Sequence, residues 1–178
     1  MRKLNALVTA ALAVLIVWHG LSGSFMLLEL NAGMSKCVAW SATTLAALHA
    51  VLSLWLGART IKAARGGKLY LRQNARFWAV RVSGIALIFL LVLHMGAFGR
   101  VRSGQFVLFE FTAARFAVEL AMAAALAVHA LAGLGPLLVS LGVPGWRSRH
   151  DGALLFLAAL LLFFAAALTV YYLMWQWL

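Results

Sequence analysis

The stretch FWAVRVSGIALIFLLVLHMGAFG, Phe77–Gly99, decides what kind of fold this chain adopts. It carries one formal charge, Arg81, and is otherwise apolar or small. It is longer than the roughly 20 residues that a helix needs to cross the hydrocarbon core of a bilayer. Four comparable runs accompany it, at Leu4–Leu30, Cys37–Ala58, Thr112–Val143 and Gly152–Leu173. We therefore expect one all-α integral membrane domain over residues 1–178, built as a bundle of five transmembrane helices.

The composition of the whole chain agrees with this expectation. Of its 178 residues, 65% are hydrophobic and 11% are charged. A soluble domain carries about 45–50% apolar and about 25% charged residues, so a soluble fold is excluded. The high hydrophobicity excludes disorder, and apolar runs without alternation exclude a transmembrane β-barrel. The single cysteine, Cys37, excludes a multi-cysteine iron–sulfur site within this chain.

Two of the five runs have features beyond their length. Arg2 and Lys3 ahead of the first run are typical of a secretory signal peptide, but the run continues past Gly20 and predicts a first transmembrane helix instead. The fourth run is long enough to require tilt or an extension past the lipid. Pro136 within it predicts a kink.

The positive charges indicate the orientation. Of the 15 Lys and Arg residues, 11 fall on one side of the predicted bundle and four on the other, namely Lys36, Arg100, Arg102 and Arg115. Basic residues mark the cytoplasmic loops of membrane proteins. We therefore expect a multi-pass protein of the cytoplasmic (inner) membrane, with its N-terminus in the cytoplasm and its C-terminus outside. The net charge of +11 then reflects topology rather than binding of nucleic acid.

Four histidines lie inside predicted spans, one in each of the first four: His19, His49, His94 and His129. An ionisable residue within a membrane span is costly and marks a functional site by default. A hydrogen bond to a neighbouring helix explains one such histidine well, but it explains one in each of four successive helices poorly. We interpret the four histidines as a ligand set.

The depths of these histidines fall into two levels. Each depth is counted at 1.5 Å per residue from a charged residue at the predicted outer surface. The depths are about 9 Å for His94, about 15 Å for His19, about 20 Å for His49 and about 21 Å for His129. His19 therefore pairs with His94 toward the outside, and His49 with His129 toward the cytoplasm.

Two histidine pairs at two depths predict two stacked bis-histidine haems. An iron with two imidazole ligands has no open position for substrate and passes electrons instead. Small neighbours such as Gly20, Gly96 and Gly133 would leave room for a flat macrocycle, although small residues also serve ordinary helix packing in membranes. A metal transporter would more often offer sulfur or carboxylate ligands that converge on one site.

This pattern resembles the di-haem cytochrome b anchor of succinate dehydrogenases and fumarate reductases, in its single-polypeptide, five-helix form. The resemblance covers nearly the whole chain and rests on the histidine pattern rather than on a dense local motif. In that family the first and third of these helices hold the haem distal from the soluble subunits, and the second and fourth hold the proximal one. The resemblance thus implies the same two pairs. One departure is Ala127, where a well-known anchor of this family has a glutamate used in proton transfer.

The resemblance also implies cofactors and partners. It implies two haem b groups, menaquinone as the membrane substrate, and two cytoplasmic partners, an iron–sulfur subunit and a flavoprotein that holds the succinate or fumarate site. The chain would be the electron-transfer subunit of that enzyme. The quinone site would lie near the outer haem, or alternatively on the cytoplasmic side near Tyr70, Trp78 and Arg81.

The resemblance also implies roles for individual residues. Members of that family often have an acidic residue at the distal quinone site, which implies Glu29 as the acceptor of quinol protons, with Glu119 as the second choice. Arg81 and Arg115 could pair with haem propionates, although snorkelling to the interface explains them equally well.

Two other functions remain open at this stage. One is the cytochrome b subunit of a hydrogenase or formate dehydrogenase, which often places two histidines on one helix, whereas no span here carries two. The other is a non-redox membrane transporter, which would contain no haem.

Overall fold

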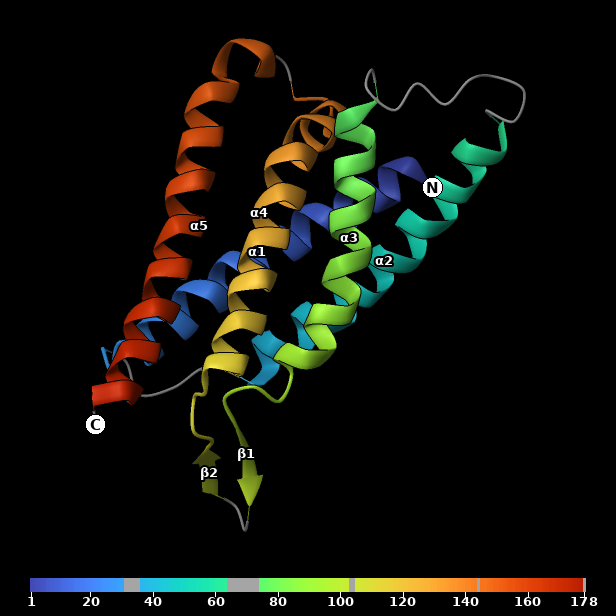
Figure 1. Ribbon diagram of the computed structural model, residues 1–178. Coiled ribbons are helices and arrows are strands. Elements are labelled where there is room, and N and C mark those ends of the chain that lie inside the picture. The colour runs from blue at the N-terminus through green and yellow to red at the C-terminus, as the bar shows by residue number, and fades with distance from the viewer. Residues whose placement is uncertain (31–35, 64–73, 103–104, 144, 178) are drawn as a thin grey trace.

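Five α-helices make up most of the chain. The computed structural model describes residues 1–30, 36–63, 74–102, 105–143 and 145–177. The helices are α1 (Arg2–Leu27), α2 (Lys36–Ala63), α3 (Ala75–His94), α4 (Ala113–Leu141) and α5 (Trp146–Trp177), labelled in Figure 1. All five are long and apolar enough to cross a membrane. The prediction of five apolar helices is therefore confirmed, and the chain is compatible with a multi-pass membrane protein.

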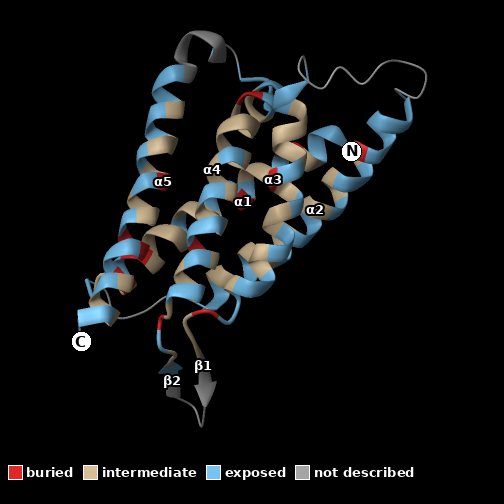
Figure 2. Cartoon of the chain, in the orientation of Figure 1, coloured by how far each residue is buried: buried red, intermediate tan, exposed pale blue. Residues whose placement is uncertain are grey.

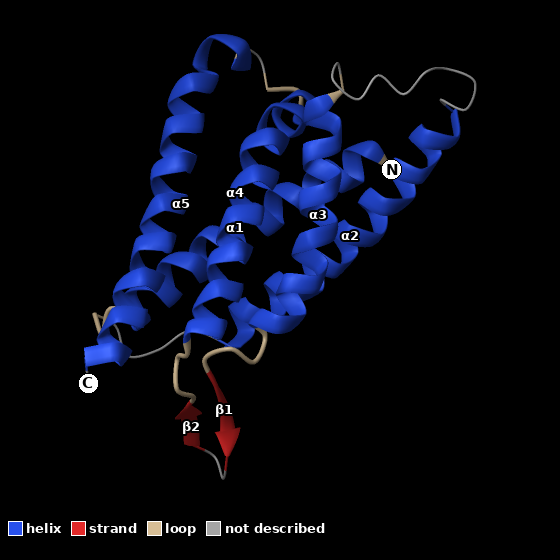
Figure 3. Cartoon of the chain, viewed as in Figure 1, coloured by secondary structure: helices blue, strands red, loops and turns tan. Residues whose placement is uncertain are grey.

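A β-hairpin between α3 and α4 was not predicted. The third span was expected to reach Gly99, but α3 ends at His94. Strands β1 (Gly99–Arg102) and β2 (Gln105–Leu108) then pair antiparallel, as Figure 3 shows in red. The sequence GRVR alternates a charged with an apolar residue, and this period of two fits a strand rather than a helix. The fifth helix is also longer than the predicted span, since it includes Trp146 at its start and Trp177 at its end.

The helices pack unevenly against one another. Extended contacts join α1 to α2, α3 to α4 and α4 to α5, and smaller ones join α1 to α4 and to α5. Within the described residues, neither α1 with α3 nor α2 with α4 makes an extended contact. Few side chains are fully buried (Figure 2), and the exposed ones include many large apolar residues such as Trp18, Phe89 and Leu155. Such surfaces suit contact with lipid chains.

The most buried apolar cluster lies at the hairpin end of the bundle. It comprises Leu27 at the end of α1, Phe111 just before α4, and Leu168 and Tyr171 near the end of α5. The hairpin and the C-terminus lie at this same end (Figure 1). Tyr171 is buried against Phe111, with ring centres 5.0 Å apart. The cluster joins the ends of three helices, and Phe98, which packs against it, also contacts His94.

Helix α4 continues through Pro136 to Leu141. Proline has no N–H, so the carbonyl four residues earlier, that of Ala132, loses its helical partner. Nε of Arg76, at the start of α3, donates a hydrogen bond to that carbonyl at 2.7 Å. Arg76 therefore compensates the proline and links α3 to α4 at the end opposite the hairpin.

Candidate functional site

The four histidines of the predicted ligand set meet in two pairs. The rings of His19 and His94 have centres 6.0 Å apart and cross at 75°. The rings of His49 and His129 have centres 6.2 Å apart and cross at 80°. These are the pairs expected from the depth of each residue. Each pair joins two helices that otherwise make no extended contact within the described residues, α1 with α3 and α2 with α4.

The two pairs lie at different levels of the bundle. Glu119 on α4 contacts His94, and His129 follows ten residues later on the same helix, which corresponds to about 15 Å. Ser83 on α3 contacts His129, and His94 follows eleven residues later, about 16 Å along that helix. We call His19 and His94 the hairpin-side pair, and His49 and His129 the central pair.

His49 of the central pair is held by Thr9 of α1. Nδ1 of His49 lies 2.9 Å from Oγ1 of Thr9. The Thr9 hydroxyl donates its only proton to the carbonyl of Asn5 at 2.6 Å. The hydroxyl must therefore accept from His49, which places the proton of the neutral imidazole on Nδ1 and leaves a lone pair on Nε2.

His129 of the central pair has the same tautomer for a similar reason. Its Nδ1 lies 3.0 Å from the carbonyl oxygen of Val80, which can only accept a hydrogen bond. Oγ of Ser83 lies 3.2 Å from the same nitrogen and donates to the carbonyl of Ala79 at 2.6 Å. Gly84 of α3 also lies against this ring, because an added Cβ would lie 3.0 Å from Cε1 of His129.

His94 of the hairpin-side pair has an acidic partner. Its Nδ1 lies 2.7 Å from Oε2 of Glu119, a residue that is 1% exposed. The other carboxyl oxygen, Oε1, is buried and has no hydrogen-bond partner among the described residues. Phe98 packs edge-on against His94, with ring centres 5.8 Å apart, and stacks on Phe111 of the apolar cluster.

His19, the fourth histidine, lacks a polar partner. Its Nδ1 is buried without a hydrogen bond to any described residue. The adjacent Gly20 was interpreted as room for a macrocycle, but the structure gives it a different role. A Cβ at Gly20 would lie 2.4 Å from the ring of Phe164, so glycine there allows α5 to approach α1.

The polar partners of the histidines follow a spacing that was missed in the sequence. Thr9 precedes His19 by ten residues, Ser83 precedes His94 by eleven, and Glu119 precedes His129 by ten. Each therefore lies one level away from the histidine of its own helix and reaches the histidine of a neighbouring helix. On α2 the corresponding positions, 38 and 39, are Val38 and Ala39, which have no polar side chain, in agreement with the unpartnered His19.

The other predicted site residues lie in different surroundings. Glu29 is exposed just after α1, with a left-handed backbone (φ 59°), and makes no side-chain hydrogen bond to a described residue. Arg115 donates to the carbonyl of Glu110 and lies over the ring of Phe109. Of the residues proposed for a cytoplasmic quinone site, Tyr70 lies outside the described residues.

Arg81 follows Val80, whose carbonyl contacts His129, and its side chain lies near Phe77 of its own helix and Gly57 of α2. Its guanidinium carbon lies 3.2 Å from the ring centre of Phe77, and its Nη1 donates to the carbonyl of that residue. A Cβ at Gly57 of α2 would lie 3.4 Å from Nε of Arg81. This Nε is buried and has no hydrogen-bond partner among the described residues.

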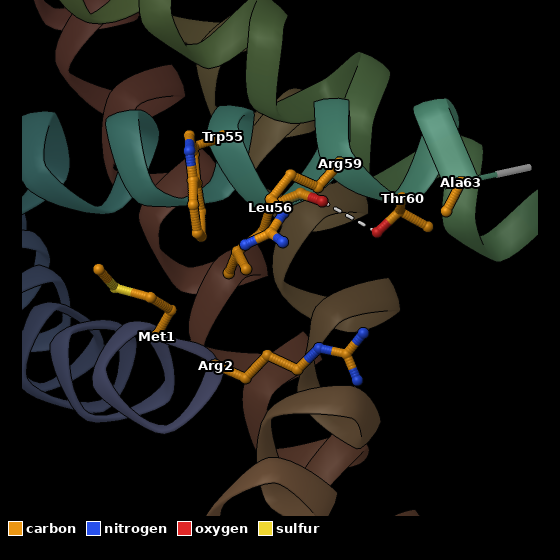
Figure 4. Close-up of a pocket in the computed structure, with 7 residues that line it drawn as sticks. All are labelled: Met1, Arg2, Trp55, Leu56, Arg59, Thr60 and Ala63. Carbon is orange, nitrogen blue, oxygen red and sulfur yellow. Dashed lines mark hydrogen bonds between the residues drawn. The ribbon is translucent and has the colours of Figure 1, made fainter.

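A separate hollow lies at the end opposite the hairpin, between the start of α1 and the end of α2 (Figure 4). Its volume is about 470 Å³, and its lining comprises Met1, Arg2, Trp55, Leu56, Arg59, Thr60 and Ala63. The guanidinium of Arg59 lies 4.8 Å from the ring centre of Trp55. Arg59 follows His49 by ten residues, about 15 Å along α2, so the hollow is distinct from the histidine pairs.

The arrangement of possible metal ligands and the similarity to known proteins complete the description of the site. Among the described residues, no group of three or more His, Cys, Asp or Glu side chains could hold a metal ion. No known protein family, curated protein or solved structure matches this chain.

Proposed function

We propose that this chain is a di-haem cytochrome b, the membrane anchor of a succinate:quinone or quinol:fumarate oxidoreductase. The observation that supports it is the pair of facing imidazoles at each of two levels, with ring centres 6.0 and 6.2 Å apart. A metal bound by an imidazole on each face lies about 2 Å from each nitrogen, so the two ring centres are about 6 Å apart. Both pairs therefore have a spacing that suits one iron.

The hydrogen bonds of the histidines favour ligation. Metal-bound histidines almost always donate the other ring N–H to a carboxylate, a carbonyl or a similar acceptor, which fixes the tautomer and the ring orientation. Thr9 and the carbonyl of Val80 accept from the central pair, and Glu119 faces Nδ1 of His94. Three of the four rings therefore have Nδ1 engaged, and Nε2 of His49 has a long contact of 3.5 Å with Oγ of Ser53.

A haem bound at each level would supply a one-electron carrier, and the residues of this chain would hold it in place. The unpartnered, buried Nε of Arg81 is a donor that suits a propionate of the haem at the central pair. Arg115 remains the candidate at the hairpin side. Absence of extended contact between α1 and α3, and between α2 and α4, is consistent with a flat group lying between these helices.

In this proposal the hairpin side faces outward and the central pair is nearer the cytoplasm, as the distribution of basic residues predicts. Electrons would pass between menaquinone in the membrane and an iron–sulfur subunit, which connects to a flavoprotein at the dicarboxylate site. The partner subunits would dock on the basic cytoplasmic side of this chain.

Haem content tests the proposal directly. The pyridine haemochrome of the purified protein, combined with a protein assay, should give two b haems per chain. One haem or none would contradict the pairing. The proteins that co-purify then separate the possible enzymes, because a hydrogenase or formate dehydrogenase partner would replace the flavoprotein while the haem ratio stayed the same.

Quinol oxidation requires a proton acceptor near the outer haem, and we propose Glu29, the exposed acid after α1. A quinol sheds two protons as it gives up two electrons, and a carboxylate in contact with water can relay them. Glu29→Gln keeps the shape of the side chain and removes the base. It should abolish reduction of the acceptor by quinol, leave both haem spectra intact, and leave activity with an artificial donor to the soluble subunits. Normal quinol turnover in Glu29→Gln would show that another group, such as Glu119, accepts the quinol protons.

A further inference from the structure

Glu119 is the only acidic side chain that contacts one of the four histidines in the part of the chain that the structure describes. We infer that Glu119 is a positioning residue: its carboxyl orients His94 and makes the iron of the hairpin-side pair harder to reduce than the iron of the central pair. This inference rests on the proposed haem function and extends it to what distinguishes the two haems.

The contact has the geometry of a strong hydrogen bond. The Nδ1–Oε2 distance of 2.7 Å falls in the range typical of charge-assisted bonds. Glu119 is 1% exposed, and the side chain of His94 is 21% exposed, so little solvent weakens the bond. Burying a carboxyl is costly unless it is hydrogen-bonded, and His94 is the partner that compensates the cost.

His94 needs a positioning partner more than the other histidines do. It is the last residue of α3, and only one further helical hydrogen bond follows, from Met95 N–H to the carbonyl of Leu91. The aromatic rings that contact His94 among the described residues are those of His19 and Phe98, both edge-on, and the hydrogen bond to Glu119 fixes the rotation of the imidazole. His49 and His129 lie well inside their helices instead.

The chemical consequence differs between the two pairs. A carboxyl that accepts the Nδ1–H of an axial histidine raises the basicity of that ligand, which stabilises ferric iron and lowers the reduction potential. The central pair donates to a hydroxyl and to a backbone carbonyl, which are neutral acceptors. The same ligand set can therefore give two unequal potentials.

A redox titration of the whole complex in membranes tests this inference. Glu119→Gln keeps an oxygen that can accept from His94 but removes the carboxylate. The equilibrium between oxidised and reduced haem at the hairpin-side pair should shift about tenfold toward the reduced form, an upward move of about 59 mV for one electron. The potential of the central haem should stay where it is, and Glu119→Asp should restore part of the change.

Matched variants separate this effect from general damage. Glu110→Gln removes an exposed acid near the same end of the bundle and should change neither potential. Thr9→Val removes the neutral acceptor of His49 and should affect only the central haem. An unchanged pair of potentials in Glu119→Gln, with both haems bound, would overturn the inference and leave the proposed function intact. A wild-type protein without haem would overturn the proposed function instead.

Discussion

The hairpin-side pair and the central pair differ in how their histidines are held, although their ring spacings of 6.0 and 6.2 Å are nearly equal. The hairpin-side pair has one acidic partner and one ring nitrogen without a hydrogen bond to a described residue, and Phe98 packs edge-on against His94. The central pair has two neutral acceptors and a glycine against one ring. The spacing of a histidine pair and the hydrogen bonds that its rings make are therefore set by different parts of the structure.

Removing one of the four proposed haem ligands should have the largest effect and tests the two pairs most directly. His49→Ala or His129→Ala should remove the haem of the central pair, and His19→Ala or His94→Ala should remove the other haem. The haemochrome ratio should fall from about two haems per chain to about one in each variant, because bis-histidine ligation needs both rings. Low-temperature spectra should show two different lost components; loss of the same component in His49→Ala and His94→Ala would disprove the pairing.

The second-largest effect should come from filling the close contact between α1 and α5. Gly20→Ala places a Cβ 2.4 Å from the ring of Phe164, and overpacking of this kind costs about 1–3 kcal/mol. Denaturation of the detergent-solubilised protein should show this loss of stability. Phe164→Ala combined with Gly20→Ala should recover part of it, because contacting residues are coupled. If Gly20→Ala lowered the stability equally with and without the Phe164 ring, the contact between Gly20 and Phe164 would not be the cause of the loss.

Removing the neutral acceptor of the central pair should have a smaller effect. Thr9→Val preserves the shape of the side chain but leaves Nδ1–H of His49 with only the longer contact to Oγ of Ser53, at 3.4 Å, at a cost of about 1 kcal/mol. Weaker haem retention during purification should be confined to the central pair, as judged by the two spectral components. A weakened hairpin-side haem in this variant would contradict the assignment of Thr9.

The smallest expected effect is a change of ring orientation without loss of haem. Gly84→Ala brings a Cβ to 3.0 Å from Cε1 of His129, so the ring must move by a few tenths of an ångström. The electron paramagnetic resonance signal of the central haem should shift, since it depends on the angle between the two imidazoles. Gly152→Ala in α5, where nothing lies within 4 Å of the added Cβ, is the matched control and should leave both signals unchanged.

The hydrogen-bond partners of the histidines could not be predicted from the sequence. Glu119 was only the second choice for the quinol site, because a carboxyl ten residues from His129 has no visible relation to His94 along the chain. The packing of α3 against α4 brings the two together at 2.7 Å. The role of Glu29 stays a prediction, as do the membrane orientation and the partner subunits.

The sequence by itself determined the five apolar helices and the levels of the four histidines. Both follow from quantities that are local to the chain, namely the run of apolar residues and the fixed rise of 1.5 Å per residue of an α-helix. The tertiary structure alone decided the hairpin after α3, the contact of Gly20 with Phe164 and the partner of each Nδ1. Such contacts depend on how far each helix is rotated about its axis and on which neighbour it faces. In this chain apolar residues lie all round each helix, so the sequence shows no preferred face from which that rotation could be predicted.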